Sequence, residues 1–230
     1  RARGVRETAR VPHQTGAPAT AVASARSAGL VRGSVEALRP TSFALAPGRC
    51  LAVVGPNGSG KSTLLDLLAG RARPTSGAVE VLGRPADEAR RACAADVSVL
   101  LAGFACYPDL TVREHLELVA AAWPAGRVLA GVDEVLAATG LGPVRGQFPD
   151  ELSSGESQVF ALACATMRPA RLLLLDEPEQ RLDADRRAQC LALLRRVKAR
   201  GISIVVATHS RELRDGLADE VLALHARDAA

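Results

Sequence analysis

Short runs of consecutive apolar residues recur along the chain and are separated by stretches with helical spacing. The runs lie within residues 50–54, 171–176 and 202–207. Runs of this length are typical of strands that are buried on both faces of a parallel sheet. Helices are expected at residues 63–69 and 184–200, and basic residues close the second of them. Strands that alternate with helices predict a mostly parallel α/β sheet.

The middle of the chain, from about residue 105 to 167, has helical rather than strand spacing. Thr111 and Glu114 form the pattern of a capping box at the start of an apolar stretch. Further helices are expected at residues 132–139, where a glycine ends the pattern, and at residues 155–167. We therefore predict a helical subdomain inserted at about residues 105–167.

The N-terminal end of the chain differs in composition from the rest. Residues 1–28 are rich in alanine, arginine, serine, threonine and proline, which predicts a disordered tail. An organelle transit peptide is the alternative, and Glu7 weighs against it because such peptides are poor in acidic residues. The first residue is not methionine, which indicates an incomplete or processed N-terminus. Strand-like segments at about residues 30–81 predict a β-rich subdomain of one domain at residues 29–226, with a tail at 227–230.

The charge of the chain is mildly basic and unevenly placed. The chain has 29 lysine and arginine residues against 25 aspartate and glutamate residues, a formal net charge of +4. The first 40 residues hold seven arginines and two glutamates, so the remainder is close to neutral. It therefore lacks the basic face that a nucleic-acid-binding protein presents, and we expect no nucleic-acid partner.

The cysteines are dispersed and show no metal-binding spacing. They are Cys50, Cys93, Cys106, Cys164 and Cys190. An odd, scattered set indicates reduced thiols in a cytosolic environment rather than a disulfide or zinc framework. No apolar run approaches the ~18 residues that a membrane-spanning helix needs. If the protein acts at a membrane, another chain must supply the spanning segments.

One stretch fits the phosphate-binding template G-x-x-x-x-G-K-[ST] without a mismatch. It consists of Gly55, Pro56, Asn57, Gly58, Ser59, Gly60, Lys61, Ser62 and Thr63. Its glycines let the backbone approach phosphate oxygens closely, and its N–H groups face the anion at the start of a helix. Lys61 is expected to reach the β- and γ-phosphates, and the Ser62 hydroxyl to bind Mg²⁺. A chance match in a glycine-rich turn is the alternative, and the strand and helix on either side favour the nucleotide site.

An acidic pair, Asp176 and Glu177, follows four consecutive leucines. The carboxyl ends of strands are where α/β sheets bind their ligands. We expect Asp176 to hold Mg²⁺ through water and Glu177 to polarise the attacking water. An acidic turn without function is the alternative, and the position of the pair after the phosphate loop favours the catalytic interpretation.

A third motif, from Leu152 to Glu156, opens a helix ahead of the acidic pair. In this order the motifs resemble the ATP-binding subunits of ABC transporters, and the resemblance extends from about Leu30 to Leu224. It implies a P-loop NTPase core with a mostly parallel sheet, a β-rich N-terminal subdomain and an inserted helical subdomain. The third motif corresponds to the family signature L-S-G-G-Q, which contacts the γ-phosphate of ATP on the opposing subunit.

The resemblance also assigns residues that would face a second subunit. It implies that Ser153 and Gly155 contact the γ-phosphate, for which a helix N-terminus is chemically suited. Ser154 and Glu156 depart from the glycine and glutamine that the family usually has at these positions. Asp183 corresponds to the loop at the subunit interface of the family.

His209 ends an apolar run and corresponds to the switch histidine of the family, which holds the γ-phosphate and the attacking water. A purely structural histidine is the alternative. Two residues usual in the family are missing. Ala102 stands in place of a glutamine that touches Mg²⁺ and signals to the membrane subunit, and alanine has no ligating atom. Val31 lies near the place of an aromatic residue that stacks on adenine, so part of the stacking energy is lost.

These features predict an ATPase that binds ATP and Mg²⁺ and uses Lys61, Glu177 and His209 as catalytic residues. We expect turnover to be slow if the alanine at position 102 weakens the site. The resemblance implies two ATP-binding subunits, closed by ATP, that power a membrane-spanning transporter subunit from the cytoplasmic face of the cell membrane. The phrase from Tyr107 to Glu114 is similar to one found in small exporter subunits.

Other functions are weighed against this one. A soluble ABC-type ATPase scaffold, as in iron–sulfur cluster assembly, would have no membrane partner, and Ala102 favours it slightly. A non-catalytic partner in a mixed dimer is disfavoured by Glu177 and His209. DNA-repair relatives carry a long coiled coil between the phosphate loop and the signature, and the interval from Thr63 to Leu152 lacks sustained heptads.

Overall fold

The computed structural model describes residues 6–7, 21–101, 104–123 and 130–225. These residues form two sheets, and all pairs of neighbouring strands in the larger sheet are parallel. Its strand order is β1 (Arg6–Glu7), β10 (Glu220–Ala223), β4 (Cys50–Val54), β9 (Ser203–Ala207), β8 (Leu172–Asp176) and β7 (Val97–Leu100). The mostly parallel α/β sheet predicted from the apolar runs is therefore confirmed.

The central strands are buried on both faces, which explains why their sequences do not alternate. Successive residues of β4 pack into two different hydrophobic clusters, Leu51 into one and Ala52 into the other. The first cluster contains residues of α1 (Lys61–Leu68). The second contains residues of α5 (Ser154–Met167) and α6 (Ala184–Ala199). Both faces of the sheet are therefore covered, as parallel sheets require.

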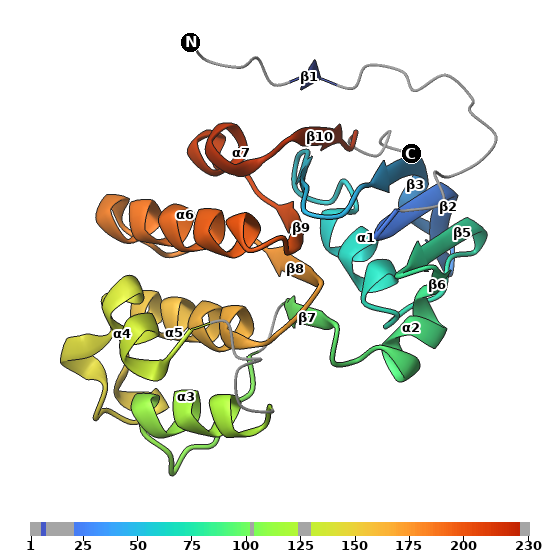
Figure 1. Ribbon diagram of the computed structural model, residues 1–230. Coiled ribbons are helices and arrows are strands. Elements are labelled where there is room, and N and C mark those ends of the chain that lie inside the picture. Colours follow the sequence, from blue (N-terminus) through green and yellow to red (C-terminus); the bar gives the residue numbers. More distant parts are fainter. Residues whose placement is uncertain (1–5, 8–20, 102–103, 124–129, 226–230) are drawn as a thin grey trace.

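The smaller sheet is antiparallel and confirms the β-rich N-terminal subdomain. Its strand order is β3 (Val35–Leu45), β2 (Ala23–Arg32), β5 (Ser76–Val81) and β6 (Arg84–Pro85). The helix α2 (Ala86–Ala92) follows β6 and contacts β5. Figure 1 shows this sheet on the right of the molecule, on the side away from α3, α4 and α5.

The predicted end of the disordered tail at residue 28 is wrong. Strand β2 begins at Ala23, and the side chains of Ala23, Ala25 and Ala28 are buried. The strand pairs with β3 on one side and β5 on the other, so its order comes from tertiary contacts. Alanine favours strands only weakly, and for this reason the composition resembled that of a disordered chain. Of the rest of both predicted tails, only Arg6–Glu7 and residues 21–22 lie within the described residues.

A helical layer lies at the lower left of Figure 1 and contains α3 (Val112–Ala121), α4 (Val132–Thr139) and α5. The capping box at Thr111 is present, and Gly140 ends α4 in the left-handed conformation with φ 68°. The helices occupy the stretch predicted for the inserted subdomain. Two short 3-10 turns connect α4 to α5, Gly142–Val144 and Pro149–Glu151.

Helices α6 and α7 (Arg211–Leu217) lie on either side of β9 in the sequence. The predicted end of α6 is confirmed within one residue, since the helix stops at Ala199 and Gly201 follows with φ 85°. Among the helices of the described residues, none combines the length and apolar character needed to cross a membrane.

Candidate functional site

The phosphate loop joins β4 to α1, and two of its glycines leave no space for a side chain. A Cβ at Gly55 would lie 2.4 Å from the carbonyl oxygen of Leu224 and 2.6 Å from the Ser59 hydroxyl. Gly60 has φ 98°, and a Cβ there would lie 2.8 Å from the Ala37 carbonyl oxygen. These neighbours belong to the protein itself. The two glycines therefore let the loop pack against β3 and against the residue after β10.

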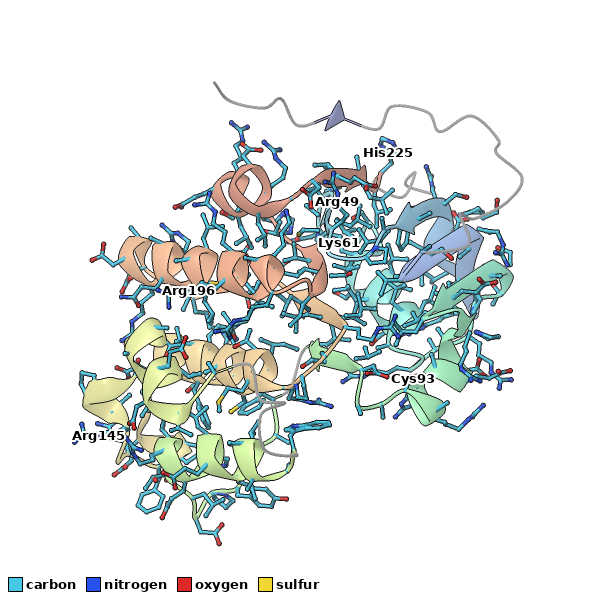
Figure 2. All side chains as sticks on the ribbon, in the orientation of Figure 1. Arg49, Lys61, Cys93, Arg145, Arg196 and His225 are labelled. Atoms are coloured by element: carbon cyan, nitrogen blue, oxygen red, sulfur yellow. The ribbon has the colours of Figure 1, made fainter. Side chains whose placement is uncertain are left out.

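Lys61 begins α1 and is only 6% exposed. Its Nζ donates hydrogen bonds to the carbonyl oxygens of Gly55 at 3.0 Å and Pro56 at 3.2 Å, which hold the ammonium group against the loop. Figure 2 labels this lysine near the middle of the molecule. The Ser59 hydroxyl is buried and has no hydrogen-bond partner among the described residues. An unpaired hydroxyl and a buried ammonium beside a glycine-rich loop fit the phosphates of a nucleotide.

The outer side of the loop is accessible. Pro56, Asn57 and Gly58 are exposed, as is Ser62 on the first turn of α1, whereas Thr63 is half-buried. A ligand can therefore reach the loop from solvent while its lysine stays in place.

The acidic pair lies where β8 ends, and Glu177 adopts the left-handed conformation with φ 48°. Its N–H donates to the carbonyl oxygen of Ala207 at 2.9 Å, which ties this turn to β9. Positive φ is unfavourable for a residue with a side chain, so it persists only where the surroundings impose it. Asp176, Glu177 and Ser62 line one groove with a volume of about 600 Å³. The groove brings the phosphate-loop hydroxyl and both acids together.

His209 follows β9 and contacts Glu177 of the acidic pair. Its Nε2 lies 3.1 Å from Oε1 of Glu177, and the two side chains are 45% and 26% exposed. The N–H of Thr208 donates to the carbonyl oxygen of Val53 at 3.1 Å, which keeps this segment beside β4. An imidazole and a carboxylate at this distance can orient and polarise a water molecule between them and a bound phosphate.

The N-terminus of α5 is the site of the third motif. Ser153 is the N-cap, and its hydroxyl donates to Oε2 of Glu156 at 2.6 Å while the Glu156 N–H donates back at 3.3 Å. Arg186 of α6 donates to the other carboxylate oxygen at 3.0 Å. Hydrogen bonds from Ser153 and Arg186 lower the pKa of Glu156 from 4.5 to about 2. A charged carboxylate therefore occupies the first turn of this helix.

Gly155 is buried in the same turn and packs against the loop that follows the acidic pair. A Cβ there would lie 3.2 Å from the carbonyl oxygen of Arg181. Ser154 is exposed, so its extra side chain is accommodated. Asp183 is the exposed N-cap of α6 and accepts a hydrogen bond from the Arg186 N–H at 2.8 Å. Arg186 therefore joins the third motif to the start of α6.

Two family models match this chain. One, described as ABC transporter, covers residues 38–180, and the other, described as AAA domain, putative AbiEii toxin, Type IV TA system, covers residues 146–215. The chain is 36% identical over 184 residues to the methionine import ATP-binding protein MetN of Nocardia farcinica, an alignment that covers 77% of this chain and 55% of that protein. The chain belongs to the ABC transporter family.

A second curated relative and a solved structure are also similar to this chain. The sulfate/thiosulfate import ATP-binding protein CysA 2 of Chromobacterium violaceum is 36% identical over 200 residues, covering 84% of this chain and 53% of that protein. This chain thus spans about half the length of the curated relatives it matches. A dimeric ATP-binding cassette solved in a post-hydrolysis state with ADP and Pi superposes with a TM-score of 0.75 at 23% identity, over 90% of this chain and 97% of that one.

Around the acidic pair of this ABC family member, the structure shows contacts that the sequence analysis did not anticipate. Gln158 of α5 donates to the carbonyl oxygens of Glu177 at 3.4 Å and Pro178 at 3.3 Å. Gln180 donates to Oε2 of Glu177 at 3.1 Å. Glu179 accepts hydrogen bonds from Thr208 and Ser210, the residues on either side of His209. A glutamine or glutamate near an acidic motif is a weak signal, and only the fold shows where such side chains point.

The sequence analysis also did not single out His115 of α3. It is 4% exposed, and its Nε2 accepts a hydrogen bond from the Tyr107 N–H at 2.8 Å. Its Nδ1 lies 3.0 Å from the carbonyl oxygen of Thr111, so Nδ1 carries the proton that is donated there. The ring also packs edge-on against Phe160. This buried histidine anchors the segment that leads into the helical layer beside the groove.

Ala102 and Val31 stand where members of the family usually have a glutamine and an aromatic residue, and the structure describes only Val31. Ala102 lies outside the described residues. Val31 lies in β2 near its end and is 47% exposed, and Val35 at the start of β3 is 46% exposed. The hairpin that would approach adenine therefore offers apolar side chains without an aromatic ring at either position.

Proposed function

We propose that this chain is the ATP-binding and ATP-hydrolysing subunit of an ABC membrane transporter and that it works as a dimer. One observation carries the proposal: Glu177 and His209 lie 3.1 Å apart, and Glu177 lines a groove together with Ser62 and Asp176. Hydrolysis of ATP needs a polarised water molecule beside a bound γ-phosphate, and this arrangement serves both needs.

The phosphate loop from Gly55 to Thr63 would hold the phosphates of ATP through its N–H groups. The buried ammonium group of Lys61 would neutralise the β- and γ-phosphate oxygens. The Ser62 hydroxyl and, through water, the Asp176 carboxylate would hold Mg²⁺. When bound, the ion supplies positive charge that stabilises the phosphate oxygens during transfer.

The two remaining groups would act on water. The Glu177 carboxylate accepts a hydrogen bond from the attacking water and polarises it, while His209 holds the water and the γ-phosphate. The hydrogen bond from Gln180 restrains one carboxylate oxygen of Glu177, and that from Gln158 restrains its backbone. The geometry of the base is thus fixed by contacts on both sides.

A second ATP-binding subunit would complete each site. Ser153, Gly155 and Asp183 lie at the starts of α5 and α6, which Arg186 joins. We propose that they face the nucleotide and the interface of the opposing subunit, so that ATP closes the dimer and hydrolysis opens it. The fold neighbour that carries ADP and Pi is a dimer, which supports this arrangement.

The other proposed partner is a membrane-spanning transporter subunit, which would hold this chain at the cytoplasmic face of the cell membrane. MetN and CysA 2 are both named as import ATP-binding proteins, which favours import. Export has only the phrase from Tyr107 to Glu114 in its favour. Substrate uptake and efflux assays in vesicles that contain both subunits distinguish the two directions.

A soluble ABC-type ATPase scaffold is a second candidate, and the alanine at position 102 favours it. The glutamine usual at that position signals to a membrane subunit, and its loss would matter less to a scaffold. A neighbouring gene for a protein with several membrane spans, together with co-purification of the two proteins, would decide against the scaffold.

The proposal is tested by ATP hydrolysis of the purified chain beside the Glu177→Gln variant, with dimer formation followed by light scattering. We expect turnover in the parent and loss of turnover with an ATP-trapped dimer in the variant. Glu88→Gln is a matched control, because Glu88 is exposed on α2. ATP binding without turnover in the parent, even at high protein concentration, would contradict the proposed hydrolysis.

A further inference from the structure

Glu179 follows the acidic pair, and its carboxylate binds the segment that carries His209. Its Oε1 accepts hydrogen bonds from the Thr208 hydroxyl and from the Ser210 N–H, the latter at 3.3 Å. Its Oε2 is buried and has no hydrogen-bond partner among the described residues. The carboxylate therefore contacts the residues on both sides of His209.

The loop after β8 and the loop after β9 are joined at two points. At the first, the N–H of Glu177 donates to the carbonyl oxygen of Ala207. At the second, Glu179 accepts from the segment 208–210. The contact between His209 and Glu177 lies between these attachments. Two fixed points on either side of a contact determine its geometry far better than one does.

Stability alone accounts poorly for a carboxylate at this position. A buried carboxylate oxygen without a partner loses its hydration and gains no hydrogen bond in return. The surroundings are apolar enough that the pKa of the nearby Cys190 thiol is raised to about 12, by burial first and by the charge of Glu179 second. Groups that are kept at a cost to stability are most common where function requires them.

We propose that Glu179 is a positioning residue for ATP hydrolysis, because its hold on Thr208 and Ser210 keeps the imidazole of His209 against the carboxylate of Glu177. The inference rests on the proposed function, since only a hydrolysing subunit needs that pair. In this role Glu179 touches neither ATP nor the water and acts through His209. Its loss therefore slows the catalytic step and leaves ATP affinity unchanged.

Steady-state kinetics of three variants test this role. Glu179→Met removes the acceptor and keeps the length of the side chain, whereas Glu179→Gln keeps one carbonyl oxygen for both donors. We expect kcat to fall about tenfold to a hundredfold in Glu179→Met with KM for ATP unchanged, and to recover largely in Glu179→Gln. Glu88→Met, on the exposed side of α2, is the control and keeps the parent kcat. Thermal unfolding of each variant is measured alongside.

A second measurement does not need turnover. The chain has four histidines, so the NMR signal of the His209 imidazole can be assigned by its loss in His209→Gln. Glu177→Gln should shift this signal in the parent, because the two side chains are in contact. The same substitution should shift it much less when Glu179→Met is also present, and by the full amount with Glu179→Gln.

The outcomes separate this inference from the proposed function. The inference would be overturned if Glu179→Met left kcat unchanged and also left unchanged the shift of the His209 signal that Glu177→Gln causes. A loss of stability in both Glu179 variants, with the imidazole response intact, would reduce Glu179 to a structural residue and overturn it as well. If the parent hydrolyses no ATP but the shift of the His209 signal still depends on Glu179, the proposed function fails and the catalytic part of the inference fails with it, while the hold of Glu179 on His209 stands.

Discussion

Arg186 of α6 pairs with Glu156 of α5 at 3.0 Å, with the two side chains 30% and 21% exposed. The same arginine bonds through its N–H to Asp183, the N-cap of α6. The first turn of α5 and the start of α6 are thus held as one unit. A displacement of either would be transmitted to the other through the Glu156 carboxylate.

This ion pair predicts a pH dependence of stability in the acid range. The pKa of Glu156 is lowered from 4.5 to about 2 by Ser153 and Arg186, so its stabilising effect is complete above pH 4.5 and is lost as the pH falls toward 2. Urea unfolding of the parent and of Glu156→Gln should therefore differ most above pH 4.5 and converge below it. The control, Glu88→Gln, should show no such convergence, and a constant difference between parent and Glu156→Gln would contradict the assignment.

The five cysteines are all free, and they should differ sharply in reactivity. Burial raises the pKa of Cys50, Cys164 and Cys190 to about 12, so these thiols stay protonated at neutral pH. A thiol reagent at pH 8 should label Cys106, which is exposed, and more slowly Cys93, which is half-buried. Labelling of all five in denaturant without a reductant would confirm that no disulfide is present.

Asp219, directly before β10, contacts both β4 and α6 and should matter for stability. It accepts a hydrogen bond from the Cys50 N–H at 2.8 Å and pairs with Lys198 of α6 at 2.7 Å, and its side chain is only 18% exposed. Asp219→Ala should lower the free energy of unfolding by about 2 kcal/mol, because it leaves both donors without this acceptor. Asp215→Ala removes an exposed aspartate nearby and should have no measurable effect in the same denaturant titration.

Val31→Tyr should raise the affinity for ATP. Val31 is exposed near the end of β2, at the place where related cassettes are expected to stack an aromatic ring on adenine. Restored stacking is worth about 1 kcal/mol or more, so the Kd for ATP should fall about fivefold or more in calorimetric titration. Val35→Tyr places the same ring on the neighbouring strand and is the control. An equal gain in both variants would show that a hydrophobic hairpin, and not stacking at position 31, causes the effect.

Local patterns were sufficient to predict most elements of this fold. The apolar runs at β4, β8 and β9, the capping box at Thr111 and the glycine after α4 each depend on neighbours in sequence, and each was predicted correctly. Strand β2 was the exception. Its early part is rich in alanine and gains order only through β3 and β5, which composition does not reveal.

The residues of the site also fall into those that local sequence patterns reveal and those that only the fold reveals. The phosphate loop and the acidic pair are motifs of contiguous residues, so they can be recognised in the sequence alone, and in the structure Ser62 and both acids line one groove. The contacts of Gln158 and Glu179 join segments that are far apart in the chain. No periodicity or spacing encodes such contacts, because the direction of a side chain depends on the packing of the elements that carry it.

The strand order has a consequence for the synthesis of the protein. Strand β4, which leads into the phosphate loop, pairs on one side with β9 and on the other with β10. Both partners lie in residues 203–223, and even the loop glycine Gly55 packs against Leu224. Non-local pairings of this kind form slowly, and unpaired strand edges are prone to aggregation. On the ribosome, both edges of β4 therefore stay unpaired until those residues emerge, and an early translational stop would leave a chain in which β4 has neither neighbouring strand.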